Sequence, residues 1–148
     1  GAAWSVRQVS AGQRALIDEG RRRVASKGEQ NSLSDYYQAL IGRQKLGEAM
    51  LKHFAQFDLV LTPTVPILPF EAGREAPAEA SSQNWLDWNP YTYPFNLTRQ
   101  PAISLPAGIS ASGLPVGLQL VAGLYQDEWL VDVAQRVEDC LQVRRPRF

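Results

Sequence analysis

The sequence predicts an α/β fold, in which helices pack on a β-sheet. A helical pattern of apolar residues runs directly into a short apolar strand, and two more strand patterns precede a closing helical pattern. The chain has 148 residues, of which 45% are hydrophobic and 20% are charged. These proportions are ordinary for a soluble globular protein and argue against general disorder.

The first part of the chain, residues 1–32, reads as a polar, helical segment. Ser10 and Gln13 have the spacing of a capping box, so we expect one helix to begin there and to run to a turn at residues 28–32. The remainder, residues 33–148, carries the patterns of a larger folded unit. We therefore divide the chain into an N-terminal helical segment (1–32) and a main portion (33–148).

Residues 33–55 give the clearest helical pattern. Ser32 and Asp35 form a second capping box. One side of the helix is apolar, formed by Leu33, Tyr36, Tyr37, Leu40, Ile41, Met50, Leu51 and Phe54. His53 lies near the end of this helix, where we interpret it as a surface or capping histidine rather than a general base, because no acid or nucleophile lies within one turn of it.

A short run at residues 58–62 is rich in branched apolar residues and predicts a buried strand, which Pro63 ends. Residues 63–94 then form a long irregular segment. A loop of this length signals either function or disorder. The aromatic residues near its end argue against disorder there.

Residues 101–122 predict a β-hairpin. Two strand patterns, at 102–105 and 115–121, flank turn residues at 110–113. Asp127 then has the character of an N-cap for a closing helix with a continuous apolar stripe. Cys140 lies on that stripe, and we interpret it as a buried core thiol rather than a nucleophile.

Composition excludes several classes of function. The chain has 15 basic and 15 acidic residues, so its formal charge gives no basis for nucleic-acid binding. It has one cysteine and one histidine, which makes a Cys/His zinc site implausible and an intrachain disulfide impossible. No apolar stretch reaches the about 18 residues of a membrane span. The sequence contains no Gly-x-Ser-x-Gly, P-loop or Gly-x-Gly-x-x-Gly motif, and we expect no metal and no cofactor.

Two stretches carry information beyond their periodicity. Residues 57–66 read FDLVLTPTVP, and residues 94–106 read PFNLTRQPAISLP before continuing as GLPVGLQLV at 113–121. Together and in this order they resemble the C-terminal third of the amidase signature family, and the resemblance extends over nearly all of residues 10–142. It implies the C-terminal part of the amidase signature fold, a partial mixed β-sheet with packed helices.

The resemblance also implies a chemistry that this sequence lacks. Family members cleave or transfer amides with a Ser–Ser–Lys triad and a backbone oxyanion hole, both located N-terminal to the matching region. No Gly-Gly-Ser-Ser-like run occurs here, and Lys27, Lys45 and Lys52 stand in no matching context. We therefore assign no catalytic residue to this chain.

The same resemblance suggests that loops of this region close an acyl pocket. The candidates for that wall combine apolar surface with hydrogen-bonding groups and are Thr62, Thr64, Trp85, Trp88, Tyr91, Tyr93 and Asn96. The alternative is that Trp88, Tyr93 and Phe95 only anchor the loop in the core. If the aromatic residues line a pocket, an apolar or aromatic amide is favoured over a charged one.

One position departs from the family pattern. Arg99 stands where the family usually has glycine, between Thr98 and Gln100. Glycine would permit a positive φ or a close backbone approach. We expect Arg99 either to adopt an ordinary conformation or to make a new contact with the loop.

The leading hypothesis is a C-terminal fragment of an amidase that is inactive alone. Its expected partners are a small amide substrate and the missing N-terminal part of the same enzyme. We expect it to bind neither nucleic acid nor membrane. We expect the protein in the cytoplasm. An uncovered sheet edge and apolar face should make the fragment self-associate. The alternatives are a free-standing non-catalytic binding module and part of a transamidating amidase subunit. The coding region upstream of Gly1 would separate the amidase fragment from the free-standing module. The aromatic rather than acidic loop argues against the transamidating subunit.

Overall fold

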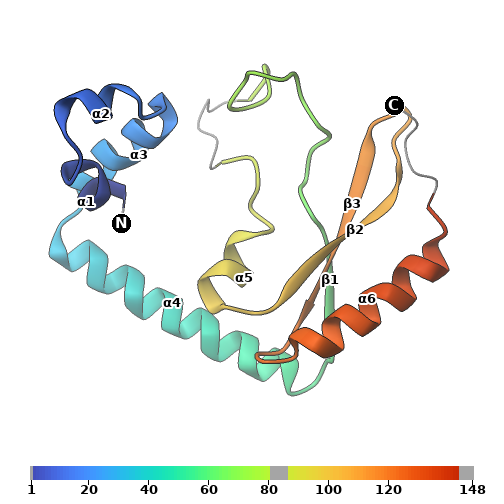
Figure 1. Ribbon diagram of the computed structural model, residues 1–148. Coiled ribbons are helices and arrows are strands. Elements are labelled where there is room, and N and C mark those ends of the chain that lie inside the picture. Colours follow the sequence, from blue (N-terminus) through green and yellow to red (C-terminus); the bar gives the residue numbers. More distant parts are fainter. Residues whose placement is uncertain (1, 81–86, 144–148) are drawn as a thin grey trace. The chain divides into compact units, whose positions relative to one another are not determined.

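The computed structural model describes residues 2–80 and 87–143, which form two compact units, Gly1–Gly42 and Arg43–Phe148 (Figure 1). The helices are α1 (Ala2–Arg7), α2 (Ala11–Ala15), α3 (Glu19–Glu29), α4 (Leu33–Phe54), α5 (Tyr93–Thr98) and α6 (Asp127–Leu141). The strands are β1 (Leu59–Pro63), β2 (Ala102–Ile109) and β3 (Pro115–Ala122). The predicted division of the chain at residue 33 falls at the first residue of α4, a helix that runs through the boundary between the units, and it stays a prediction.

The first unit contains more helices than its sequence pattern predicts. The capping box of Ser10 and Gln13 is present, but it begins only the short helix α2. Asp18 then caps a separate helix, α3, by accepting a hydrogen bond of 2.7 Å from the backbone N–H of Arg21. The expectation of one helix was wrong because Asp18 offers the backbone a second start site. The predicted turn at 28–32 begins later, since α3 continues to Glu29.

Helix α4 begins and ends close to its predicted bounds. The Ser32–Asp35 capping box is confirmed, because each side chain accepts a hydrogen bond from the other residue's backbone N–H. The predicted apolar side is present but largely uncovered: α4 has no fully buried residue, and Tyr37 and Leu51 are each 57% exposed. Of the residues on that side, only Met50 and Phe54 are half-buried. His53 is exposed in the last turn, where its ring stacks on that of Phe57.

The sheet has three strands in the order β1-β3-β2, and both pairs are antiparallel. The predicted hairpin is confirmed as β2 and β3, and with it the α/β fold class, but the described strands form an antiparallel sheet and not the partial mixed sheet that was expected. Gly113 closes the turn with a φ of 82° and donates its N–H to the carbonyl of Ser110. Pro63 and Pro106 lie on the two outer strands, where a missing N–H is tolerated.

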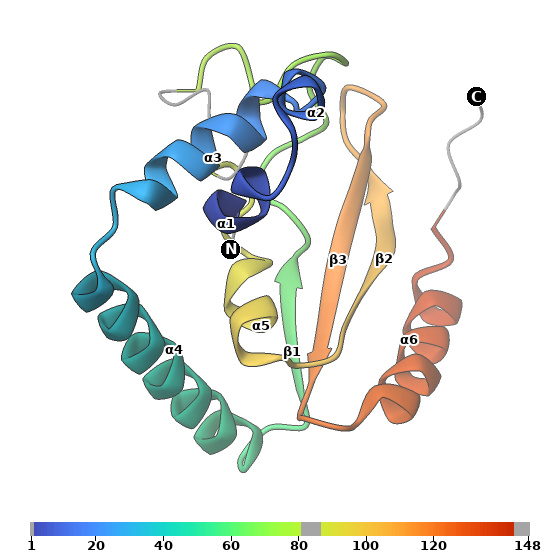
Figure 2. The same cartoon turned by 60° about the vertical axis from the view of Figure 1, so that its left-hand side comes forward.

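The core lies between the sheet and α6. Leu105, Leu120 and Ala122 on one face of the sheet pack with Leu130 and Ala134 of the helix. Figures 1 and 2 show α5 on the opposite side of the sheet from α6. The core thus combines the alternating apolar residues of β2 and β3 with the apolar stripe of α6.

Three expectations about the second unit need correction. Cys140 is exposed rather than buried, because it lies beyond the part of α6 that packs on the sheet. The helix begins after Gln126, so Asp127 is its first residue and not its cap. Strand β1 is an outer strand of this sheet, and Leu61 on it is 56% exposed rather than buried.

Helix α5 was not predicted from the sequence, and its end explains the unusual arginine. Arg99 is the C-cap of α5 and has a left-handed backbone, with φ 65° and ψ 27°. Its backbone N–H donates to the carbonyl of Phe95. The expectation of an ordinary conformation was wrong, since Arg99 keeps the conformation that glycine adopts most readily.

Candidate functional site

The irregular segment between β1 and α5 is held together by aromatic side chains. Trp88 donates its indole N–H to the carbonyl of Glu75 at 3.0 Å. The ring of Phe70 meets that of Trp88 edge to face, with centroids 5.4 Å apart. These contacts join the beginning of the segment to its end, so this part of it is folded, as its aromatic content predicted.

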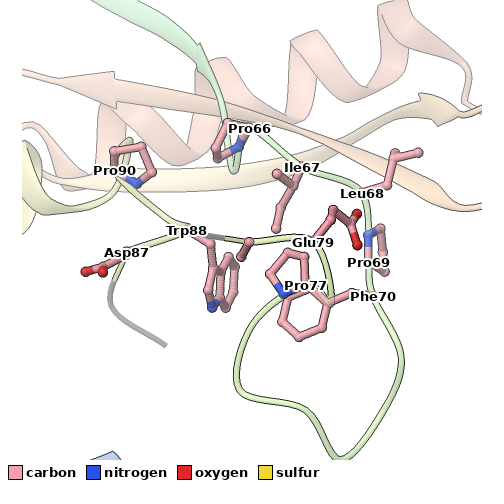
Figure 3. Close-up of a pocket in the computed structure, with 11 residues that line it drawn as sticks. Pro66, Ile67, Leu68, Pro69, Phe70, Pro77, Glu79, Asp87, Trp88 and Pro90 are labelled. Atoms are coloured by element: carbon pink, nitrogen blue, oxygen red, sulfur yellow. The ribbon is translucent and has the colours of Figure 1, made fainter. Parts of the chain in front are cut away.

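A pocket of about 580 Å³ lies between the two halves of this segment (Figure 3). This volume is within the range of about 300–1,000 Å³ that small-molecule sites occupy. Its described lining is apolar apart from Glu79 and Asp87, and it comprises Pro66, Ile67, Leu68, Pro69, Phe70, Pro77, Glu79, Ala80, Asp87, Trp88 and Pro90. The geometry suits a ligand with a substantial apolar body.

Of the predicted site residues that the structure describes, one lines this pocket. Trp88 is part of its wall, whereas five others are not, namely Thr62, Thr64, Tyr91, Tyr93 and Asn96. Trp85 lies outside the described residues. The sequence patterns did not identify Phe70 and the proline-rich run before it, although an apolar stretch in a long loop was the available signal.

A row of polar side chains connects the irregular segment between β1 and α5 (residues 64–92, the aromatic segment) to the sheet. Gln119 lies directly opposite Thr62 on one neighbouring strand and Ser104 on the other. Gln119 is 6% exposed, and its side-chain amide donates to Thr62 Oγ1 at 2.9 Å and to the Tyr91 carbonyl at 3.1 Å. Gln119 therefore holds Tyr91 against the end of β1. The sequence signal was a glutamine between two leucines of a strand.

A second polar contact crosses the central strand. The hydroxyl of Thr64, the residue after β1, lies 2.6 Å from the hydroxyl of Ser104 on β2, although β1 and β2 do not pair with each other. They meet above Gly117, where a Cβ atom would lie 2.6 Å from Thr64 Oγ1. Glycine at this position is what allows the two hydroxyls to meet.

Tyr93 and Asn96 lie on α5. Tyr93 is partly buried, and this burial raises the pKa of its phenol above the ordinary value, with the negative charge of Asp87 raising it further. Asn96 is exposed. Neither residue is part of the described pocket lining, so a role in ligand binding for either one stays a prediction.

The described parts of the chain show no constellation for nucleophilic catalysis. Across residues 2–80 and 87–143, no serine shares a hydrogen bond with a lysine, and the Ser110–Ser112 hydroxyl pair at 2.9 Å lies in the hairpin turn. The same residues contain no group of three His, Cys, Asp or Glu side chains that could hold a metal ion. None of the helices in these ranges has the length and hydropathy that crossing a bilayer requires.

Comparison with known proteins gives consistent matches. A family model for Amidase matches residues 4–131. A glutamyl-tRNA(Gln) amidotransferase subunit of Alkaliphilus metalliredigens is 36% identical over 108 residues, which are 73% of this chain and 21% of that protein. The 6-aminohexanoate-cyclic-dimer hydrolase of Paenarthrobacter ureafaciens is 36% identical over 105 residues, 64% of this chain and 21% of that protein.

Solved structures show the same fold. A structure of 6-aminohexanoate cyclic dimer hydrolase matches with a TM-score of 0.76 at 24% identity, over 99% of this chain and 34% of that one. A bacterial aryl acylamidase of the amidase signature family matches with a TM-score of 0.73 at 20% identity, over 97% of this chain and 34% of that one. The chain thus spans about a fifth of the length of the curated relatives that it matches, at 21%, 26% and 18% for three of them.

Proposed function

Because the chain belongs to the Amidase family, we propose that it is the C-terminal part of an enzyme that hydrolyses amides. In this proposal it contributes part of the sheet and one wall of the substrate pocket. The observation that carries the proposal is the family match over residues 4–131. In addition, this chain spans only a small share of the length of each relative. A cytoplasmic location remains a prediction.

We propose further that the chain is inactive by itself. Nucleophilic catalysis needs a nucleophile and a base within hydrogen-bond reach of each other, and donors aimed at the developing oxyanion. The described residues contain no serine bonded to a lysine. The reactive groups would then come from the N-terminal part of the same enzyme.

The uncovered apolar side of α4 supports such a partner. Leu33 is 70% exposed, and Tyr37 and Leu51 are each 57% exposed, although the helix pattern marks this side for burial. Apolar surface of this kind usually marks an interaction site. We propose that the N-terminal part of the enzyme covers it.

A second candidate function is transamidation within a larger assembly. Several curated relatives carry the name of glutamyl-tRNA(Gln) amidotransferase. A pocket for glutamine should include charged groups, and the pocket lining contains Glu79 and Asp87. The names of these relatives favour the candidate, whereas the described lining contains no cationic side chain for the carboxylate of glutamine.

The test compares the 148-residue chain with the product of the complete gene that encodes it. We expect the chain alone to release no product from aryl and aliphatic amides and the complete product to do so. Glutamine-dependent ammonia transfer in place of simple hydrolysis would favour the second candidate. Turnover by the chain alone, abolished by substitution of one of its own serines, would refute the proposal. No activity in the complete product would instead favour a non-catalytic binding module.

The proposed pocket wall is tested separately in the complete product. Trp88→Ala should change kcat/KM across a series of acyl chains, because it removes a large apolar wall. The matched control is Trp129→Ala, whose side chain is 41% exposed on α6. Unchanged selectivity in Trp88→Ala, or the same change in the control, contradicts a pocket role for Trp88.

A further inference from the structure

The pocket in the aromatic segment has two walls that reach the sheet separately. Residues 66–70 form the first wall and follow β1, whereas Asp87, Trp88 and Pro90 form the second wall and precede α5. In Figure 3, Pro66 and Pro90 lie at the end of the pocket nearest the strands. The width of the pocket at that end depends on what holds the two walls relative to each other.

The first wall is attached to the sheet just beyond the end of β1. Thr64 donates its backbone N–H to the Gly117 carbonyl at 3.0 Å, and its hydroxyl lies 2.6 Å from that of Ser104. Pro66 follows two residues later. Proline restricts its own φ and also the conformation of the residue before it. The start of the first wall therefore has a fixed position on the sheet.

Gln119 attaches the second wall to the same part of the sheet. Its side-chain amide donates to Thr62 Oγ1 at 2.9 Å and to the Tyr91 carbonyl at 3.1 Å. The amide group has two N–H donors, so these two acceptors use both of them. Tyr91 directly follows Pro90 of the second wall. A single amide thus joins the strand that leads into the first wall to the residue that follows the second.

Burial makes this link hard to replace. Gln119 is 6% exposed, so water has little access to take over the hydrogen bonds of its amide. Methionine has a similar length but offers no donor to either oxygen. The spacing between Thr62 and Tyr91 therefore depends on the amide itself and not on the bulk of the side chain.

We propose that Gln119 is a positioning residue that sets the width of this pocket and thereby determines which acyl groups the enzyme accepts. The inference rests on the proposed amidase function and adds a specificity-determining residue to it. Gln119 does not line the pocket, so it acts through the two walls and not by contact with a ligand. The hydrogen bond from Trp88 to the Glu75 carbonyl is a separate link within the segment. Loss of the Gln119 amide should therefore widen the pocket near the sheet while this second link remains.

The first test measures kcat and KM of the complete gene product for the p-nitroanilides of butanoic, hexanoic and octanoic acid. Gln119→Met should reduce the ratio of kcat/KM between the best and the worst of these substrates about fivefold, because a wider pocket discriminates less between acyl chains. The change should lie mainly in KM. The matched control is Gln135→Met, since Gln135 donates to Asp139 on an exposed face of α6, and it should keep the ratio of the parent.

A double variant tests whether Gln119 acts through the wall. Trp88→Ala removes the large side chain of the second wall. Adding Gln119→Met to it should then change the substrate ratio little further, because two residues that act on one property are not additive. Fully additive changes would overturn the inference. So would an equal fall in kcat for all three substrates with an unchanged ratio, since that result describes a structural role alone.

Thr62→Val guards against a Gln119 variant that does not fold. Valine suits a strand, and this change removes only one of the two acceptors, so the substrate ratio should fall in the same direction by about twofold. A ratio equal to that of the parent in both Thr62→Val and Gln119→Met would overturn the inference.

A measurement without turnover separates this inference from the amidase function. In the 148-residue chain, the Trp88 indole N–H should exchange with water about threefold faster in Gln119→Met and Thr62→Val than in the parent, while the hairpin amides keep their protection. Trp88→Phe assigns the signal. Unchanged indole exchange in both variants would overturn the inference. An inactive complete product would contradict the amidase function, and indole exchange would then decide whether Gln119 positions the pocket.

Discussion

Arg99 has a backbone conformation that is costly for any residue with a Cβ atom. Its φ of 65° ends α5, and its side chain is exposed. Left-handed backbone costs a residue other than glycine roughly 1–2 kcal/mol, part of which is offset by the greater freedom of glycine in the unfolded chain. Arg99→Gly should therefore raise the free energy of unfolding by about 0.5–1 kcal/mol.

Urea denaturation measures this change, and Arg99→Ala is the matched control. Alanine also removes the guanidinium group but keeps the Cβ atom, so it should give no gain. Equal stabilisation by alanine and glycine would assign the effect to the lost charge and contradict the backbone explanation.

Tyr93 makes stability depend on alkaline pH. Its phenol has a raised pKa in the folded chain because of burial and because of the charge of Asp87. The unfolded chain therefore releases this proton at a lower pH than the folded chain does, so the stability contributed by Tyr93 is present below about pH 10 and is lost as the pH rises through the folded pKa.

Tyr93→Phe removes this dependence. The difference in unfolding free energy between the parent and the variant should shift in favour of the variant as the pH rises from about 9 to 11. Tyr125→Phe is the control, because its side chain is 94% exposed. Parallel stability curves for the parent and Tyr93→Phe would show that folding does not perturb this phenol.

Among the elements, β3 has a structural role beyond its ladders, since Gln119 ties it to the aromatic segment. Its amide donates to Thr62 Oγ1 and to the Tyr91 carbonyl. Gln119→Met keeps the approximate shape but leaves both acceptors without this donor. We expect a loss of about 1–2 kcal/mol in unfolding free energy and faster hydrogen exchange in the segment before α5.

Gln135→Met provides the comparison, because Gln135 donates to Asp139 on an exposed face of α6. Its effect should remain within about 0.5 kcal/mol. Equal losses of stability in the two variants would show that the hydrogen bonds of Gln119 do not stabilise the aromatic segment. Unchanged hydrogen exchange in that segment of Gln119→Met would show the same.

At the scale of elements, sequence patterns predicted what depends on nearby residues. The capping box at Ser32, helix α4 and the hairpin follow from local spacing, and all three are present. The patterns did not predict α5, which has no side-chain cap and is only six residues long. They also placed Cys140 in the core, because periodicity reports a face of a helix but not where its neighbour ends.

The site was harder to predict because it depends on distant residues. The pocket joins Phe70 to Trp88 across a segment without periodicity. The contact between Thr64 and Ser104 needs Gly117 on β3, which lies between β1 and β2. No spacing rule connects such positions, so the sequence identified the aromatic segment but not the residues that Trp88 faces.

For the whole molecule, the uncovered side of α4 predicts self-association. Leu51 is 57% exposed on this helix. Static light scattering should show a mass that increases with concentration, and Leu51→Glu should lower it, because charge opposes burial of the apolar side. The control, Val131→Glu on α6, replaces an aliphatic residue that is 59% exposed.

A monomeric mass at every concentration would contradict the prediction. An equal effect of both substitutions would assign association to general surface charge rather than to α4.

The strand order β1-β3-β2 has a consequence for synthesis on the ribosome. β1 ends at Pro63, but its pairing partner begins only at Pro115. At roughly 5–20 residues per second, a nascent chain carries β1 without its partner β3 for about 3–12 seconds, until Ala122 has been translated. During that interval its apolar side chains are open to chaperones and to neighbouring nascent chains, until the hairpin and then α6 follow from the ribosome.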